Sequence, residues 1–339
     1  MLGACPDEGF MAYRFKTSEP LAKGFRRIAA QQISAAEKRL ASPVGGPVQI
    51  DPVQVHEARK NLKRARALLR LMRPALGEAV FKRENARMRD VGRLLSARRD
   101  IHVIDQTILK IEASHGSLPV AVIEKLRAAI ASTRDTIDTQ ATAEGAEKAA
   151  AMLRQSLAAL RRVKLEGEGF DLVRPGLKRS YAACRKAFKE AYGQPCAETS
   201  HEWRKTIQQH WRQMLLLSRA WPEALLPRAR AARQISDLLG EDHDIALLLA
   251  YLAGHPELPL SARDRQRIAG HCMARQAEIR AQCEPLGARL LAEPPKDHCR
   301  RISAYWQAAA KIQEAPGEAA EPPAGEPAKV PEPAPDKVA

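Results

Sequence analysis

Two short stretches of this chain are so similar that they constrain the whole architecture. VHEARK contains His56, SHEWRK contains His201, and the two histidines are 145 residues apart. Downstream, LLSARRDI at 94–101 matches LLGEDHDI at 238–245 with an offset of 144. Two matches at nearly one offset predict an internal duplication. The repeated unit is too long for a solenoid repeat and suits a helical bundle that is present twice.

The composition favours helices in both units. The chain has 339 residues, of which 45% are hydrophobic and only 4% are aromatic, a balance that is typical of helical proteins. We therefore predict an all-α fold of two pseudo-symmetric helical bundles of the four-helix type. The predicted divisions are a leader at 1–18, a first bundle at 19–165, a second bundle at 170–313 and a tail at 314–339. The tail has seven prolines and a net charge of −4, from six acids and two lysines, and this composition predicts disorder.

Turn signals divide the two units into helices. The expected helices cover 19–40, 52–73, 75–97, 100–114, 175–192, 223–240, 242–255, 261–282 and 285–313. Two more are expected within 120–164, joined near Gly145. The helix that contains SHEWRK is expected to begin with a capping box of Thr199 and Glu202. The leader is expected to include an extended piece at 13–15.

The helix expected at 52–73 has two distinct faces when its residues are placed at about 100° intervals. Its apolar stripe, which should pack on a core, consists of Ala58, Leu62, Ala65, Leu69 and Met72. Its stripe of proton-donating side chains consists of His56, Arg59, Lys63, Arg66 and Arg70. Glu57 is the only acid among these 22 residues, against seven lysines and arginines. Because like charges at helical spacing repel one another, we infer that a multiply anionic partner compensates.

The second copy of this helix keeps the basic stripe only in part. His201 and Arg204 occupy equivalent positions, and Lys205 and Arg212 lie on a neighbouring strip. The positions equivalent to Lys63, Arg66 and Arg70 hold Gln208, Trp211 and Leu215. We therefore expect anion binding mainly at the first copy.

The net charge of +15 points to a polyanion: nucleic acid, an acidic membrane surface or another phosphate polymer. No window of 18 apolar residues is free of charge, so no membrane span is expected. The N-terminal MLGACPDEGF carries acids and no apolar run, which argues against a signal peptide and for a cytoplasmic location. Nothing in the sequence indicates an oligomeric state.

Metal ligands are not expected. The six cysteines form no CxxC pair, so zinc ligation and a disulfide framework are both disfavoured, and reduced thiols fit a cytosolic protein. We interpret the acidic group of Glu241, Asp242 and Asp244 as an exposed loop with helix caps rather than as a metal site. The His-Cys neighbours at 271–272 and 298–299 are interpreted as chance pairs. No cofactor is predicted.

Several separate motifs resemble the CHAD domain, the conserved histidine α-helical domain. HEARKNLKRAR is followed some 40 residues later by ARRDIHVI. The stretches GFRRIAAQQISAAEKRL and GLKRSYAACRKAF, and the second histidine helix with SHEWRK, resemble other parts of that family. The resemblance covers about residues 10–313. Neither a strand-rich segment nor an ExExK motif is present, so the chain resembles the stand-alone form without a triphosphate-hydrolysing tunnel domain.

The resemblance implies a pair of bundles around a basic central groove or pore. It also implies binding to inorganic polyphosphate and association with polyphosphate granules. By position, the family's histidines correspond to His56 and His201. Its basic residues correspond to Arg59, Lys63, Arg64, Arg66, Arg204 and Lys205, and in the bundle-opening helices to Arg26, Arg27, Lys178, Arg179 and Arg185. With Arg70 and Arg212 from the charge pattern, these form the candidate polyphosphate site. Gln208 and Gln209 stand where the family has basic residues, which reduces the share expected from the second half.

Two other classes of function are open at this stage. A nucleic-acid binder fits the charge, although no RRM, helix-turn-helix or zinc-finger pattern is visible and few aromatics are available for stacking. An enzyme, either a metal-dependent phosphohydrolase or a histidine phosphocarrier, would need a carboxylate-held metal or a positioned nucleophile. Because the basic stripe has no adjacent carboxylate apart from Glu57, a non-enzymatic polyphosphate-binding module is the favoured prediction. If the histidines act as donors at this site, binding should strengthen below about pH 6.5.

Overall fold

A computed structural model describes residues 13–40, 52–95, 99–115, 119–135 and 139–314. Within these ranges all regular elements are helices, which confirms the predicted all-α class. The α-helices are α2 (Leu21–Leu40), α3 (Pro52–Leu71), α4 (Arg73–Leu76), α5 (Glu78–Leu94), α6 (Arg99–His115), α7 (Val120–Asp135), α8 (Thr139–Arg162), α9 (Arg174–Gly193), α10 (Ala197–Leu217), α11 (Pro222–Gly254), α12 (Ala262–Leu290) and α13 (Pro295–Glu314). Two short 3₁₀ helices are η1 (Gly169–Leu172) and η2 (Ser218–Ala220). Residues 1–12 of the predicted leader and 315–339 of the predicted tail lie outside the described residues.

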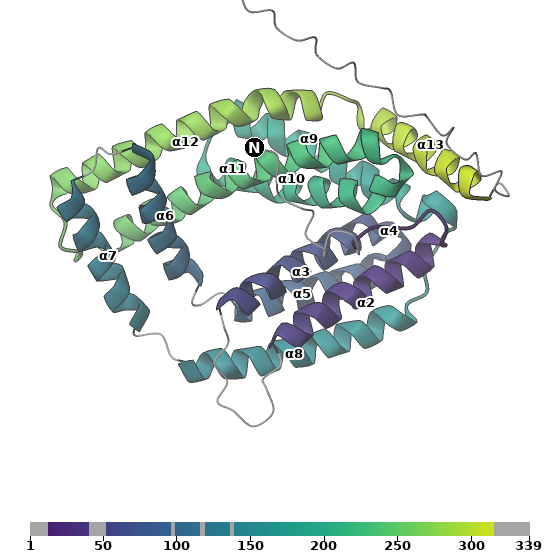
Figure 1. The fold of residues 1–339 in the computed structure, drawn as a ribbon, viewed down its shortest axis with the longest axis horizontal. Coiled ribbons are helices and arrows are strands. Elements are labelled where there is room, and N and C mark those ends of the chain that lie inside the picture. The colour runs from purple at the N-terminus through teal and green to yellow at the C-terminus, as the bar shows by residue number, and fades with distance from the viewer. Residues whose placement is uncertain (1–12, 41–51, 96–98, 116–118, 136–138, 315–339) are drawn as a thin grey trace, which may run out of the picture.

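The first group of helices consists of α2, α3, α5 and α8, which pack against one another (Figure 1). Apolar residues at helical spacing, such as Phe25 and Ile28 of α2, are fully buried between them. A buried polar link joins α5 to α8, because Glu84 accepts hydrogen bonds of 2.7 Å from Ser156 and from Arg87. With a further hydrogen bond of 2.8 Å from Arg83, three donors satisfy the carboxylate, as a buried charge requires.

The second group consists of α9, α10, α11 and α12, with α10 packed on both α9 and α11. Trp203 of α10 is 1% exposed and contacts the ring of Phe188 on α9. Across the α11–α12 contact, Arg280 forms an ion pair of 2.9 Å with the buried Asp242, and Gln276 donates to the Asp242 carbonyl. The group therefore combines an apolar core with a bonded polar layer.

The two groups meet where α9 and α10 pack on α3. Gly176 of α9 lies against the end of α3 so closely that a β-carbon would be 1.9 Å from the Leu71 carbonyl oxygen. Only glycine fits there. In addition, Phe15 donates its backbone N–H to the Leu216 carbonyl at 2.9 Å, and the Tyr13 hydroxyl donates to the Arg64 carbonyl at 2.8 Å. The N-terminal segment thus ties α3 to α10.

The hydrophobic cores do not follow chain order. The helices α6 and α7 come from the first half, but Ile104, Ile108 and Leu126 belong to the core of the second group. Conversely, Ile302 and Trp306 of α13 belong to the core of the first group. In Figure 1, α6 and α7 stand at one end between the two groups, and α13 lies at the other end. The sequence units 19–165 and 170–313 therefore stay a prediction about the chain, and the packing mixes them.

Several predicted helix boundaries were wrong in the second half. The helices expected at 223–240 and 242–255 are one continuous helix, α11. The acidic group around Asp242 is inside that helix and not in an exposed loop with caps. The helix α12 continues through Pro285 to Leu290, where a break had been expected. In both places packing of the helix against its neighbours overrides the local turn signal.

Other boundaries were also corrected. The helix expected at 75–97 is divided into α4 and α5 at Gly77, which has a positive φ of 73°. Gly145 lies inside α8 rather than at a join. The capping box of α10 is formed by Cys196 and Thr199, not by Thr199 and Glu202, because the helix begins at Ala197. No helix of the described residues is both long and apolar enough to span a membrane.

Candidate anion-binding site

The two faces of α3 are placed as its periodicity predicted. All five residues of the apolar stripe are buried: Ala58, Leu62, Ala65, Leu69 and Met72. On the basic stripe His56 is exposed, and the four cations are partly exposed: Arg59, Lys63, Arg66 and Arg70. The helix therefore packs into the first core with one side and presents cations on another.

Two stripe arginines also hold α3 to α5. Arg59 donates from Nη1 to the Gly92 carbonyl at 2.6 Å, and Arg66 donates from Nε to Asn85 Oδ1 at 3.1 Å. Burial, and then repulsion from Arg89 of α5, lowers the pKa of Arg66. A carbonyl and an amide are neutral acceptors, so these contacts fix the guanidinium positions without cancelling the charge.

Arg70 is the most perturbed cation of the stripe. Burial, then repulsion from Arg66, lowers its pKa to about 10, whereas the charge of Glu202 on α10 acts in the opposite direction and Arg73 adds further repulsion. The residue thus stands at the contact between α3 and α10. It is repelled by Arg66 and Arg73 on its own side of the contact and attracted by the carboxylate of Glu202 on the other side.

Arg212 of α10 brings a buried cation to the contact with α3. It is 7% exposed and donates from Nη1 to the Gln208 carbonyl at 2.8 Å. Its guanidinium carbon lies 4.5 Å from the centre of the Trp211 ring. Its Nε has no hydrogen-bond partner among the described residues.

Electrostatic neighbours of Arg212 come from three helices. Burial lowers its pKa to about 10, and repulsion from Arg64 of α3 and Arg204 of α10 contributes in the same direction. Tyr13 and Asp237 act in the opposite direction. We name as the cation cluster the residues Arg64, Arg66 and Arg70 of α3 with Arg204 and Arg212 of α10.

The second histidine lies beside this cluster and contacts another histidine. The ring centres of His201 and His243 on α11 are 4.3 Å apart. Burial lowers the pKa of His201, repulsion from Lys205 and Arg204 lowers it further, and Glu202 opposes the shift. Glu202 also forms an ion pair with Lys205. A carboxylate therefore already stands among the cations of α10.

Two other predicted site residues, Arg26 and Arg27, make contacts outside the cluster. Arg26 donates to the Val163 carbonyl at 3.0 Å, next to the end of α8. Arg27 forms an ion pair with Glu19 and donates to a backbone carbonyl at 2.9 Å. On α9, Lys178 and Arg179 are exposed and Arg185 is partly exposed. Their part in anion binding, like that of the whole predicted site, stays a prediction.

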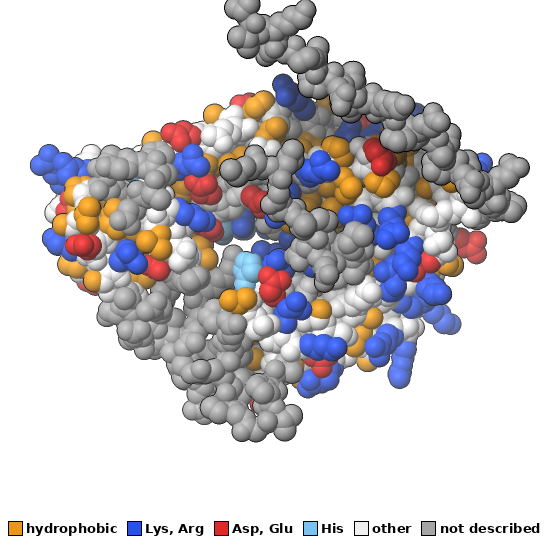
Figure 2. All heavy atoms as spheres, in the orientation of Figure 1, with side chains coloured by type: hydrophobic (Ala, Val, Ile, Leu, Met, Phe, Trp, Pro, Cys, Tyr) orange, Lys and Arg blue, Asp and Glu red, His pale blue; other side chains and the backbone are white. Residues whose placement is uncertain are grey.

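Figure 2 shows a hollow between the two groups of helices, with lysine and arginine side chains on its rim. Sequence reasoning missed two arginines on α11, Arg230 and Arg233. Arg233 lies 5.5 Å from the centre of the Trp211 ring, next to the cation cluster. The run RARAAR at 228–233 was the available signal, but its helix had not been placed beside α10.

The residues considered as metal ligands have other roles. Glu241 forms an ion pair of 2.6 Å with Arg275, and Asp242 is held by α12 as described above. His298 stacks on the ring of Tyr181, 3.9 Å between centres, and Cys272 is buried. Among the described residues, no group of three or more His, Cys, Asp or Glu side chains is arranged to hold a metal ion.

Comparisons with known proteins agree with the sequence resemblance. A structure search finds the crystal structure of the CHAD domain from the plant Ricinus communis, with a TM-score of 0.57 and 17% identity. The match covers 83% of this chain and 94% of that one, which establishes a common fold. No curated protein matches the chain. The sequence pattern of the CHAD domain matches residues 26–253, and the chain therefore belongs to the CHAD-domain family.

Proposed function

We propose that this protein binds inorganic polyphosphate, as a non-enzymatic module, at the cation cluster between α3 and α10. The observation that carries the proposal is the position of Arg212, a buried guanidinium with Arg64 and Arg204 nearby. Within the described chain it forms no ion pair with a carboxylate. A buried cation beside other cations is unfavourable by several kcal/mol unless an anion compensates. A bound polyanion would supply that compensation.

The chemistry of polyphosphate suits this arrangement. The polymer has about one charge per phosphate and no bases, so its partner needs repeated cations rather than aromatic platforms. Cations three and four residues apart on a helix are about 5–6 Å from each other, which is comparable to one or two phosphate steps. Arginine adds bidentate hydrogen bonds and lysine adds a point charge.

Membership of the CHAD family supports polyphosphate over other polyanions, because the family resemblance implies this ligand. The same binding would bring the protein to polyphosphate granules in the cytoplasm. Duplex nucleic acid is the second candidate, and the net charge of +15 favours it. The two ligands differ in charge spacing, since duplex DNA carries one charge per about 1.7 Å of helix axis on a stiff rod.

The test is a titration of the full chain with long-chain polyphosphate at two salt concentrations, with duplex DNA as competitor. The variant replaces Lys63, Arg66 and Arg70 with alanine. Its matched control replaces Arg161, Arg162 and Lys164, three exposed cations at the end of α8. Both variants remove the same formal charge from the first half, so a difference between them reports position rather than net charge.

We expect wild-type binding that DNA does not displace and that weakens steeply with salt, because counterions are released on binding. The α3 variant should lose at least about a hundredfold in affinity, since each charge-assisted contact contributes about 1.5–3 kcal/mol. The α8 control should lose much less. Equal affinity for DNA would favour the nucleic-acid alternative, and phosphate release with Mg²⁺ or Mn²⁺ would contradict a non-enzymatic role.

A further inference from the structure

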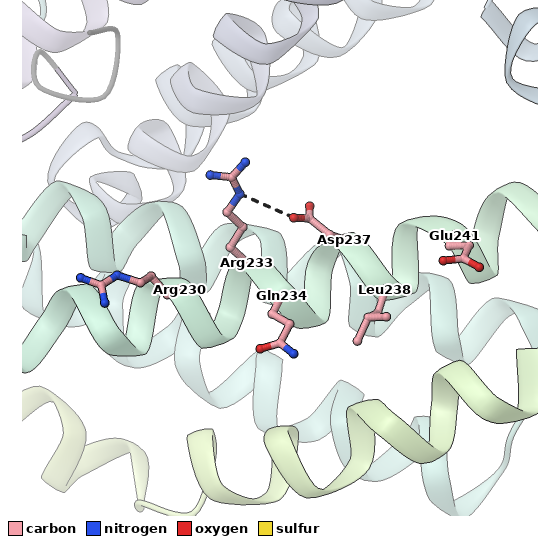
Figure 3. A pocket seen from close by; sticks show the side chains of 6 residues that line it. All are labelled: Arg230, Arg233, Gln234, Asp237, Leu238 and Glu241. Atoms are coloured by element: carbon pink, nitrogen blue, oxygen red, sulfur yellow. Dashed lines mark ion pairs between the residues drawn. The ribbon is translucent and has the colours of Figure 1, made fainter. Parts of the chain in front are cut away.

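The helix α11 carries a cavity that no predicted site residue lines. The cavity has a volume of about 460 Å³ and is lined by Arg230, Arg233, Gln234, Asp237, Leu238 and Glu241. Figure 3 shows that Arg233 and Asp237 point toward the helices of the first half, whereas Gln234 and Leu238 point to the other side of α11. The part of this cavity that contains Arg233 and Asp237 therefore faces the hollow between the two groups of helices.

Trp211 connects this cavity to the cation cluster. Its ring centre lies 4.5 Å from the guanidinium carbon of Arg212 and 5.5 Å from that of Arg233. Arg212 in turn is near Arg64 of α3. Guanidinium groups thus follow one another from α3 across α10 to α11, and the indole between them is an apolar surface on which both cations rest.

Two carboxylates line the cavity: Glu241 is held by Arg275, whereas Asp237 is held only weakly. Asp237 forms an ion pair of 3.5 Å with Arg233, and the two side chains are 66% and 55% exposed. Exposed pairs of this kind contribute about 0–1 kcal/mol and are screened by salt. A phosphate group, which offers several acceptor oxygens, would compete successfully for the same guanidinium.

We propose that the phosphate-binding track continues onto α11, where Arg230 and Arg233 bind phosphate groups of a chain already held by the cation cluster, and where Asp237 is the resident counter-ion that the chain displaces. The inference rests on the proposed function, because the polyanion is the same one. Arg230 is one helical turn before Arg233, so two consecutive cations are available at the spacing of the α3 stripe. The second half then supplies from α11 the cations that α10 lacks.

The test compares the double variant Arg230→Ala/Arg233→Ala with the control Arg263→Ala/Arg267→Ala, which removes two exposed arginines of α12. Both are titrated with long-chain polyphosphate and with tripolyphosphate. We expect the α11 variant to lose about tenfold or more in affinity for the long chain, with a smaller salt dependence. Tripolyphosphate, which is too short to occupy the whole track, should bind both variants alike. Equal losses for the two variants with the long chain would overturn the proposal.

A second variant, whose expected effect on affinity has the opposite sign, keeps the test informative if the double variant misfolds. Asp237→Asn should tighten long-chain binding by about two- to fivefold at low salt, because it removes a weakly held competitor. Its control is Asp297→Asn, which breaks a pair of 3.0 Å with Arg300 on α13. Weaker binding by Asp237→Asn, or no difference from the control, would contradict the counter-ion role.

If the wild type does not bind polyphosphate at all, the proposed function itself fails. If it binds and the α3 variant loses binding while the α11 variant matches its control, only this inference fails.

Discussion

The two histidine helices, α3 and α10, begin with almost the same sequence and meet different surroundings. The cations of the α3 stripe are partly exposed, and the opposite face packs into one core. The later part of α10 is buried on all sides, with Met214, Leu215, Leu216 and Leu217 each at most 6% exposed. A helix that is apolar all round is a buried helix. The comparison teaches that α10 has apolar residues, of which Leu215 is buried, at positions where α3 presents cations.

The difference can be followed at single positions. The equivalent pairs are Lys63 with Gln208, Arg66 with Trp211 and Arg70 with Leu215. Leu215 packs in the first core, where an arginine would be a buried charge. Trp211 contacts both cores and carries two guanidinium groups on its ring. The weaker basic stripe of α10 thus has a packing explanation.

The difference between α3 and α10 can be tested most directly by exchanging residues of the basic stripe. Replacing Lys63 and Arg66 with glutamine removes two cations that α10 lacks at the equivalent positions, and we expect a loss of about 30-fold or more in polyphosphate affinity, because two charge-assisted contacts disappear. The slope of affinity against salt should fall by about 1–2. The measurement is titration at several salt concentrations, with urea unfolding to check that the loss of the Arg66–Asn85 hydrogen bond costs only about 1 kcal/mol.

The reciprocal change Gln208→Lys serves as the control, since it adds a cation to α10 at a partly exposed position. A gain much smaller than the loss in α3 would support a division of labour between the helices. Equal and opposite effects would mean that the two helices contribute alike.

The core faces of the two helices also differ, which predicts a difference in acid stability. Where α3 has Ala65, α10 has the fully buried His210, whose ring is 5.5 Å from that of His298. Burial lowers the pKa of His298 to about 4. The groups that face it are Glu293, Arg301 and Arg228, with the rings of Tyr181 and His210.

Because the unfolded His298 has a pKa of about 6.5, the unfolded chain binds the proton first as the pH falls. Stability that is fully present above pH 6.5 should therefore decline as the pH approaches about 4, by about 3 kcal/mol. Urea unfolding at pH 7, 5 and 4 measures this loss. His298→Phe keeps a ring to stack on Tyr181 and should flatten the decline. If the stability of the variant declines as steeply as that of the wild type, other groups cause the acid sensitivity.

Much of the first half could be predicted from sequence, because local signals and packing agree there. The bounds of α3 were expected at 52–73 and are Pro52–Leu71, and its apolar stripe is buried as periodicity required. In the second half of the chain, local sequence signals and packing disagree. Gly240 reads as a helix end, yet it lies inside α11 with the Arg204 guanidinium 3.5 Å from the position of a β-carbon. The side chain of a neighbouring helix fills that space, and single-sequence reasoning cannot supply it.

The candidate site shows the same limit. The stripe of α3 follows from 100° periodicity alone, whereas the closeness of Arg64 to Arg212 depends on the packing of two helices far apart in the chain. The structural role of Arg27 was equally hidden, because its partner Glu19 lies before α2 begins. Spacing predicts which residues share a helix face, and tertiary packing decides what that face meets.

A matched pair of carboxylates can sharpen the comparison between α3 and α10. Glu57 pairs with Lys60 on α3, and Glu202 pairs with Lys205 on α10, at equivalent positions of the two helices. Only the charge of Glu202 also acts on Arg70 across the contact. We expect Glu202→Gln to tighten polyphosphate binding about threefold, because a competitor for two candidate cations is removed. Glu57→Gln is the control, and an equal gain from it would show that the location of the carboxylate is immaterial.

The smallest expected effect concerns the two histidines and pH. An anion raises the pKa of a histidine that it contacts, so affinity should rise as the pH falls and level off below the pKa of the free protein. Burial and the cations Lys205 and Arg204 lower the pKa of His201, so its contribution should appear below about pH 6.5. We expect His201→Gln to remove about a twofold rise between pH 6.5 and 5, measured by titration at constant ionic strength.

His56→Gln is the comparison, because His56 is exposed on α3, whereas His201 is partly buried and its ring lies against that of His243 on α11. If the low-pH part of the rise disappears only in His201→Gln, the histidine of the buried helix is in contact with the ligand despite the loss of its basic stripe. If it persists in both variants, protonation elsewhere drives it, and the pairing of His201 with His243 is then a packing contact. The pH profile therefore separates a helix that still binds from one that has become purely structural.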